Sequence, residues 1–236
     1  GFNDTRGTLF YNVAEFIKVN QPACFILENV KGLLSHDNGK TYQTITDVLT
    51  NGGGTLNGQM GMDTIEDGLG YHVYTKVLNT KDYGIPQNRE RIFIVGFKYW
   101  RTFNFPVKLP LKLKLKDLLQ DNPNSKYILS EKMVKYIFEP SKGDWKSGSM
   151  TIDTNIAKCI NARVFRMGRA DTDNYITVDD KIRRLTPLEC WRLQGFLDEE
   201  FYKAQKVNSD IQLYKQAGNS ITVNVMTAIL KKIYLS

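Results

Sequence analysis

The apolar positions near the start of the chain predict a helix followed by a buried strand. Between Thr8 and Val19, one broad helical face collects six apolar residues: Leu9, Phe10, Val13, Ala14, Phe16 and Ile17. We therefore predict a helix over residues 1–20, ended by Pro22. The run 23–27 is almost wholly apolar and leads into Glu28. Such a run indicates a strand buried on both faces, in the centre of a covered α/β sheet.

Further elements are predicted between residues 31 and 98. A polar loop at 31–39 precedes a helix from about Lys40 to Leu49, and strands follow at 72–79 and 91–97. The stretch 51–70 has too many glycines for a regular element, so we interpret it as a flexible insertion. A lid, or a disordered tail of the preceding helix, is also compatible with it.

The pattern changes at about residue 99, where we predict a separate, smaller, mixed domain. Leucine and lysine alternate strictly over 111–116, which fits a half-buried strand or an extended edge with a solvated lysine face. The segments 121–125 and 139–144 have the composition of loops.

Two helices are predicted near the end of the chain. Thr186 and Glu189 form a capping box with Pro187 at the first helical position, and this helix should run to about Gly195. Residues 211–218 lead into a final helix, capped by Asn219 or Ser220. Six residues give that helix one apolar face: Ile221, Val225, Met226, Ile229, Leu230 and Ile233.

Composition narrows the class of protein. The 236 residues are 42% hydrophobic, enough for a sizeable core, and no apolar stretch approaches the ~20 residues of a membrane helix. The three cysteines, Cys24, Cys159 and Cys190, are far apart and form no CxxC pair, which fits a reducing compartment without structural zinc. His36 and His72 are the two histidines, and each is alone in the sequence, so we expect no metal site.

The net charge of +7 is concentrated in the middle of the chain. Residues 98–184 carry 18 basic and 10 acidic side chains, a net charge of +8, which leaves −1 for all other residues. A basic field of this kind suits a polyanion such as nucleic acid. A lysine-rich solvated surface would give the same count, and charge alone does not separate the two.

Five segments, in this order and spacing, resemble the motifs of the DNA cytosine-5 methyltransferases. They are Gly1–Phe10, Glu28–Val30, Gln87–Arg91, Arg184–Cys190 and Gln216–Ser220. The family's glycine-rich cofactor loop and its Pro-Cys-Gln loop, which carries the nucleophile, are not present in the sequence. The resemblance therefore implies the C-terminal portion of such an enzyme, after the Pro-Cys loop.

The resemblance implies a fold and a function. The fold would be α/β, part of a Rossmann-like sheet of S-adenosylmethionine-dependent methyltransferases plus a smaller mixed target recognition domain. Residues 1–98 would form the C-terminal half of the catalytic domain and 99–210 the recognition domain, with 211–236 a final helix returning to the catalytic domain. The complete enzyme would methylate carbon 5 of a cytosine flipped out of a specific duplex sequence, as in a restriction-modification system.

The resemblance also implies catalytic residues. The Glu28 carboxyl would act on ring N3 as a general acid and read N4, while Arg91 would hold cytosine O2. Arg89 would support the pocket or bind phosphate, and odd positions of a strand would let both arginines face one pocket. Alternatives remain open: Glu28 could cap a helix or pair with an arginine, and the arginines could form surface salt bridges with Glu90. Asn29 should fix the loop through hydrogen bonds to the backbone.

Cofactor and DNA contacts follow from the same resemblance. Asn219 and Ser220 would line the S-adenosyl-L-methionine pocket, in addition to capping a helix. Arg163, Arg166 and Arg169 are candidates for reading guanine in double-stranded DNA, although phosphate contact or solubility would explain them as well. None of the cysteines lies in a Pro-Cys loop, so we predict structural roles for all three.

The expected partners are double-stranded DNA and the missing N-terminal half, on the same or a separate chain. Without that half we expect residues 1–236 to be inactive and to expose an unfinished sheet edge. The resemblance implies a cytoplasmic protein that is encoded by a bacterium or a phage. Three other functions stay open: a non-catalytic DNA-binding subunit of a split methyltransferase, a tRNA cytosine-5 methyltransferase, and a basic DNA-binding module.

Overall fold

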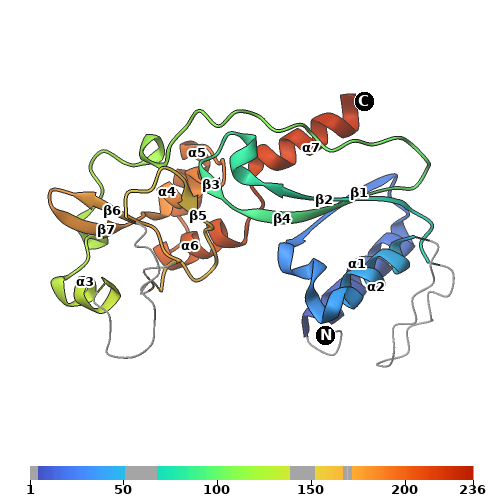
Figure 1. The fold of residues 1–236 in the computed structure, drawn as a ribbon, viewed down its shortest axis with the longest axis horizontal. Helices are drawn as coiled ribbons and strands as arrows, with labels where there is room; N and C mark the ends of the chain where they lie inside the picture. The colour runs from blue at the N-terminus through green and yellow to red at the C-terminus, as the bar shows by residue number, and fades with distance from the viewer. Residues whose placement is uncertain (1–4, 51–67, 139–151, 167–168, 170–171, 236) are drawn as a thin grey trace. The chain divides into compact units, whose positions relative to one another are not determined.

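The computed structural model describes residues 5–50, 68–138, 152–166, 169 and 172–235, which form the mixed α/β fold that the sequence predicts (Figure 1). The chain divides into two compact units, one of residues 1–78 and 90–105 and the other of residues 79–89 and 106–235. Most of the predicted glycine-rich insertion, the predicted loop at 139–144 and the first four residues of the first motif lie outside the described residues.

A three-stranded sheet forms the centre of the first unit, in the order β1 (Cys24–Val30), β4 (Glu90–Phe97), β2 (His72–Asn79). β1 and β4 are antiparallel. The predicted strands are confirmed, but the central place predicted for β1 is wrong: among the described residues β1 is an edge strand, and Phe25 is its one buried residue. An apolar run does not tell a central strand from its neighbour, and β4 carries the longer run.

Helices α1 (Thr5–Asn20) and α2 (Lys40–Leu49), both predicted as helices, lie side by side against one face of this sheet (Figure 1). Between β1 and α2 the chain makes two 3-10 turns, Lys31–Leu34 and His36–Gly39. The apolar face predicted for α1 is only partly correct. Its buried or half-buried residues are Phe10, Val13, Ala14 and Ile17, while Leu9 and Phe16 are exposed.

The second unit is built from short elements. These are the 3-10 turns Thr80–Tyr83, Leu115–Leu118 and Ser125–Tyr127, strands β3 (Gln87–Asn88), β5 (Ala157–Lys158), β6 (Tyr175–Val178) and β7 (Lys181–Arg184), and helices α3 (Glu131–Phe138), α4 (Pro187–Arg192), α5 (Asp198–Gln205), α6 (Asp210–Asn219) and α7 (Val223–Leu235). β3 pairs with β5 in parallel, and β6 pairs with β7 antiparallel. Helices α4, α5 and α6 enclose the core of this unit around Trp191, Leu193 and Phe201.

Two predictions in this unit need correction. Residues 111–114 form no strand; Leu115 is buried at the start of a 3-10 turn, and its N–H donates to the Asn155 carbonyl. The leucine–lysine alternation at 111–116 therefore belongs to a segment without strand pairing, which the Leu115 N–H connects to the Asn155 carbonyl. Residues 210–219 are a helix in their own right, so Ser220 caps the C-terminus of α6, and α7 starts only at Val223. The prediction that Asn219 or Ser220 caps the last helix is wrong.

The compact units do not coincide with the predicted three-part organisation. Helices α6 and α7 belong to the same unit as residues 106–210, and residues 79–89 join them there. The assignment of 1–98, 99–210 and 211–236 to functional domains stays a proposal.

A buried ion pair connects β7 to the start of α4. Thr186 and Glu189 form the predicted capping box: the Thr186 side chain accepts the Glu189 N–H, and the Glu189 carboxylate accepts the Thr186 N–H at 2.8 Å. Both terminal nitrogens of Arg183 donate to that carboxylate at 2.8 Å, and the Gln120 N–H adds a further bond at 2.9 Å. Arg183 and Glu189 are 1% and 0% exposed, so the two charges depend on each other.

We predict that Glu189→Gln lowers the free energy of unfolding by about 3–5 kcal/mol, because it leaves the Arg183 guanidinium buried without a counter-charge. Asp198→Asn is the control. Asp198 binds Arg192 at 2.6 Å, but both side chains are partly exposed, so the loss there should stay within about 1 kcal/mol. Urea denaturation followed by circular dichroism measures both. Equal losses would show that burial does not set the strength of the Arg183–Glu189 pair.

Candidate functional site

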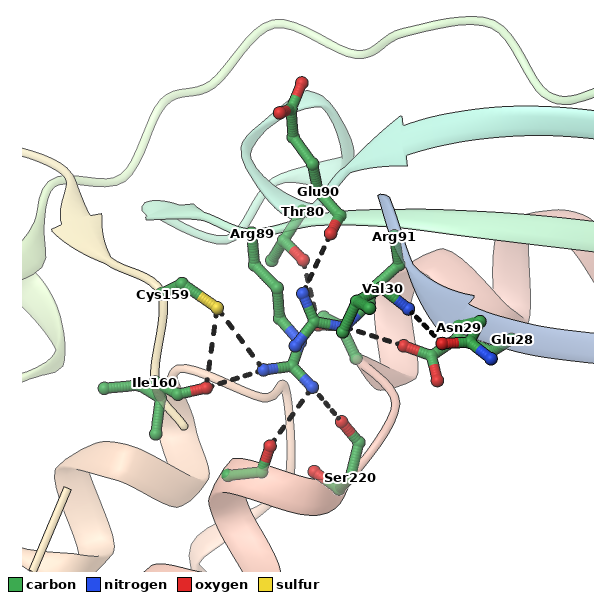
Figure 2. A network of polar contacts seen from close by, with 12 residues as sticks. Glu28, Asn29, Val30, Thr80, Arg89, Glu90, Arg91, Cys159, Ile160 and Ser220 are labelled. Atoms are coloured by element: carbon green, nitrogen blue, oxygen red, sulfur yellow. Dashed lines mark hydrogen bonds and ion pairs between the residues drawn. The ribbon is translucent and has the colours of Figure 1, made fainter. Parts of the chain in front are cut away.

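A carboxylate and a guanidinium meet at the C-terminal end of β1. In the register of the sheet Glu28 is opposite Phe93, and Val30 is opposite Arg91. Glu28 and Arg91 are therefore diagonal neighbours on one face, close enough for long side chains to touch. Arg91 Nε lies 2.9 Å from Glu28 Oε1, and the two side chains are 16% and 18% exposed (Figure 2). Glu28 therefore does pair with an arginine, which is one of the two alternatives to a catalytic role, and neither side chain is fully buried.

Neighbouring contacts orient this pair. Arg91 Nη1 donates to the Glu90 carbonyl at 2.8 Å, and the Val30 N–H donates to Asn29 Oδ1 at 2.8 Å. The Glu90 carboxylate binds Lys31 at 3.0 Å. Asn29 thus makes the side-chain-to-backbone bond predicted for it. Because Glu90 binds Lys31 and Arg91 binds Glu28, the structure does not favour the alternative of a surface salt bridge between Arg91 and Glu90.

Arg89 lies in a different environment, inside the second unit. It is 3% exposed, and its guanidinium donates to the carbonyls of Ile160 at 2.6 Å, Ser220 at 2.8 Å and Gly218 at 3.2 Å (Figure 2). Arg89 and Arg91 are two residues apart but have different kinds of partner. The Arg89 guanidinium is thus bound by backbone carbonyls, and its two expected roles, support of the pocket or phosphate binding, stay predictions.

Asn219 and Ser220 lie where α6 ends. Asn219 is exposed and Ser220 is half-buried. The Ser220 N–H donates to the Gln216 carbonyl at 3.0 Å, and its hydroxyl donates to the Ala217 carbonyl at 3.1 Å. The Asn219 amide and the acceptor side of the Ser220 hydroxyl are groups that can bind the polar parts of a cofactor such as S-adenosylmethionine. The donor set therefore fits the expected role.

The arginine-bearing loop is exposed at the surface of the second unit. Arg163, Arg166 and Arg169 are all exposed. The Asn161 side chain accepts the Arg163 N–H at 2.8 Å, which shapes the turn, and the Arg166 guanidinium lies 5.6 Å from the Phe165 ring centroid. These side chains are placed to meet a ligand from solvent, and phosphate and base edge remain equally compatible with them.

The cysteines occupy packed positions. Cys190 is fully buried, and burial raises the pKa of its thiol well above the usual value. Burial also raises the pKa of Cys24. Cys159 is half-buried, with its sulfur 3.6 Å from Arg89 Nη1. In the described part of the chain no cluster of His, Cys, Asp and Glu could hold a metal ion, and no helix has the length and apolarity to cross a bilayer.

Sequence reasoning missed two residues that hold this region together. Gln87 is completely buried, and Gly218 lies at a backbone contact where a side chain would not fit. Gln87 lies two residues before Arg89 in the Gln87–Arg91 motif, and its place in that motif was the available signal. For Gly218 the sequence shows only a glycine within a helix, which indicates a close approach without naming the partner.

Comparison with known proteins covers nearly the whole chain. The model of the family C-5 cytosine-specific DNA methylase matches residues 1–57 and 62–235. The type II methyltransferase M.SsoII of Shigella sonnei is 36% identical to this chain and matches 99% of it. The type II methyltransferase M.HaeII of Haemophilus aegyptius is 38% identical and matches 97% of it. The chain spans only 58% and 66% of the length of these two relatives.

Solved structures agree on the fold. The chain superposes on an Entamoeba histolytica methyltransferase, EhMeth, with a TM-score of 0.73, and on the S. pombe Dnmt2 methyltransferase with 0.70. Each superposition covers 98% of this chain, with 16% sequence identity. It covers 69% of the EhMeth chain and 71% of the S. pombe chain. By its match to the family model over almost all of its length, the chain belongs to the C-5 cytosine-specific DNA methylase family.

Proposed function

We propose that the chain is the C-terminal portion of a DNA (cytosine-5-)-methyltransferase, following the segment that carries the nucleophile. The complete enzyme would transfer a methyl group from S-adenosylmethionine to carbon 5 of a cytosine flipped out of a specific duplex. The observation that carries this proposal is the Glu28–Arg91 pair, a partly buried carboxylate and guanidinium at a strand end. The family and the partial coverage of the relatives support it.

The pair has the groups that activation of cytosine requires. When a nucleophile adds to carbon 6, negative charge develops on ring N3 and O2. A carboxyl at Glu28 can donate a proton or a strong hydrogen bond to N3 and accept one from the amino group at carbon 4. Arg91 can donate to O2, and its contact with Glu28 keeps both groups oriented before the base arrives.

The rest of the chain would bind the other participants. S-adenosylmethionine supplies the methyl group, and Asn219 and Ser220 would contact its polar groups at the end of α6. The segment 98–184, with its net charge of +8, would form the recognition surface, led by Arg163, Arg166 and Arg169. Duplex DNA is the substrate that this basic surface favours.

We predict that Glu28→Gln in the complete enzyme lowers the single-turnover rate about 10²–10⁴-fold, the usual contribution of a general acid. The amide keeps the shape of the side chain but cannot supply the proton, so DNA affinity should change little. Quenched single-turnover reactions give the rate, and fluorescence anisotropy gives the affinity.

Glu90→Gln is the matched control for this experiment. Glu90 is adjacent to Arg91 in sequence, but its carboxylate binds Lys31 on the surface, so its loss should leave the rate unchanged. A normal rate for Glu28→Gln, with a lowered melting temperature, would make Glu28 a bracing residue and remove it from the mechanism.

A second prediction concerns DNA binding. Changing Arg163, Arg166 and Arg169 together to Gln should weaken duplex binding and reduce its salt dependence, because the log–log salt slope falls by about 0.9 for each phosphate that the protein no longer neutralises. Titrations at several salt concentrations measure the slope. The control variant changes three exposed lysines elsewhere in the second unit to Gln: Lys203, Lys206 and Lys231. It loses the same three positive charges as the arginine variant. If both triple variants lose the same affinity, general charge rather than this loop binds DNA.

A further inference from the structure

Gln87 and Arg89 are two buried polar side chains from the same short stretch of chain. They are 0% and 3% exposed, and the Arg89 N–H donates to the Gln87 carbonyl at 3.0 Å, so a tight turn joins them. β3, which contains Gln87, pairs in parallel with β5, so this stretch runs beside the segment that leads to residue 160. Buried amide and guanidinium groups are costly unless they form hydrogen bonds, and here backbone groups bind the Gln87 amide and both terminal nitrogens of Arg89.

Both side chains bind the same residue. The Ile160 N–H donates to Gln87 Oε1 at 2.9 Å, and Arg89 Nη1 donates to the Ile160 carbonyl at 2.6 Å. Gln87 Nε2 also donates to the Leu193 carbonyl, just after α4, at 2.6 Å. Ile160 is therefore held at both of its backbone polar groups, which fixes the position and the orientation of the chain at that point.

The other end of the Arg89 guanidinium binds the end of α6. Arg89 Nη2 donates to the carbonyls of Ser220 at 2.8 Å and Gly218 at 3.2 Å (Figure 2). One rigid planar group thus bridges Ile160 to the turn at 218–220. A lysine ammonium cannot reproduce this arrangement, because it lacks the fixed fork of donors.

Gly218 allows the segment 160–162 and the turn 218–220 to lie in direct backbone contact. A Cβ at this position would lie 2.2 Å from the Asn161 carbonyl carbon and 2.3 Å from the Ala162 nitrogen. The chain at 161–162 therefore crosses the end of α6 in direct backbone contact. A shift of the 160–162 segment must move the turn at 218–220, and a shift of the turn must move the segment.

These contacts join two parts that the proposed function uses for different ligands. Ile160 is followed at once by the loop that carries Arg163 and Arg166, whereas Ser220 belongs to the turn that would hold the cofactor. We propose that Gln87, Arg89 and Gly218 form a clamp that couples DNA recognition to cofactor binding. DNA that fixes the arginine loop also fixes the cofactor turn, and by linkage the cofactor strengthens DNA binding by the same factor. This inference rests on the proposed function, and in it Gln87 and Arg89 are positioning residues.

The test is the affinity of the complete protein for S-adenosylmethionine, measured by calorimetry with and without a duplex. The duplex is one that the wild-type protein methylates, chosen by bisulfite sequencing of a randomised library. We expect the duplex to raise the affinity of the wild-type protein about 5-fold or more, the lower end of typical coupling. In Arg89→Lys the factor should fall below about 2, because the ammonium cannot bridge both segments.

Arg183→Lys is the matched control. Arg183 is an equally buried arginine in the same unit, but it binds Glu189 and touches neither Ile160 nor the turn at 218–220. It should lower the melting temperature as Arg89→Lys does and still keep the wild-type coupling factor. A purely structural role for Arg89 predicts the same coupling in both variants.

Two further measurements apply if Arg89→Lys does not fold. Gly218→Ala should also abolish coupling, because its Cβ forces the 161–162 backbone away from α6. Hydrogen exchange on the wild-type protein needs no variant: S-adenosylmethionine should slow exchange of the amides at 160–164. No slowing there, coupling unchanged in the folded variants, or no coupling in the wild type would overturn the clamp. Wild-type protein that neither binds the cofactor nor methylates the library would instead overturn the proposed function.

Discussion

The guanidinium groups of Arg89 and Arg91 need polar partners wherever they are withdrawn from water, and the arrangement around residues 87–91 follows from this requirement. Arg91 meets it with the Glu28 carboxylate at the end of β1. Arg89 meets it with backbone carbonyls from two segments of the second unit. A carboxylate thus neutralises the charge of Arg91, whereas backbone carbonyls bind the guanidinium of Arg89 and hold two segments of the second unit together. In the proposed function, this short stretch supplies Arg91 to the reaction and Arg89 as a positioning residue of the second unit.

The sequence predicted the elements well where periodicity and capping were strong. The helices α1 and α2, the strands around Glu28 and Arg91, and the capping box at Thr186 all form as expected. Prediction from sequence failed where the structure of a segment depends on contacts with residues distant in sequence. The leucine–lysine alternation at 111–116 suggested a strand, but residues 111–114 pair with no neighbouring strand. The apolar run of β1 gave a strand, but neither its place in the sheet nor burial on both faces.

The candidate site was predictable in part for the same reason. The resemblance identified Glu28 and both arginines, but the spacing of Arg89 and Arg91 suggested one shared role, and their contacts differ. That difference comes from tertiary contacts with Ile160, Gly218 and Ser220, which lie about seventy to one hundred and thirty residues away. No local pattern encodes such contacts. Glu189 shows the opposite case, since its role as a cap was evident while its ion pair with Arg183 was not.

In the proposed function, this chain belongs to an enzyme that methylates carbon 5 of cytosine in DNA. Mass spectrometry of nucleosides tests it most directly, after incubation of the complete protein and S-adenosylmethionine with unmethylated duplex DNA and, separately, with tRNA. The account predicts 5-methyl-2′-deoxycytidine from the duplex and no methylated cytidine from the tRNA. Methylation of tRNA alone, methylation at the amino nitrogen of cytosine, or no methylated nucleoside from either substrate would contradict it.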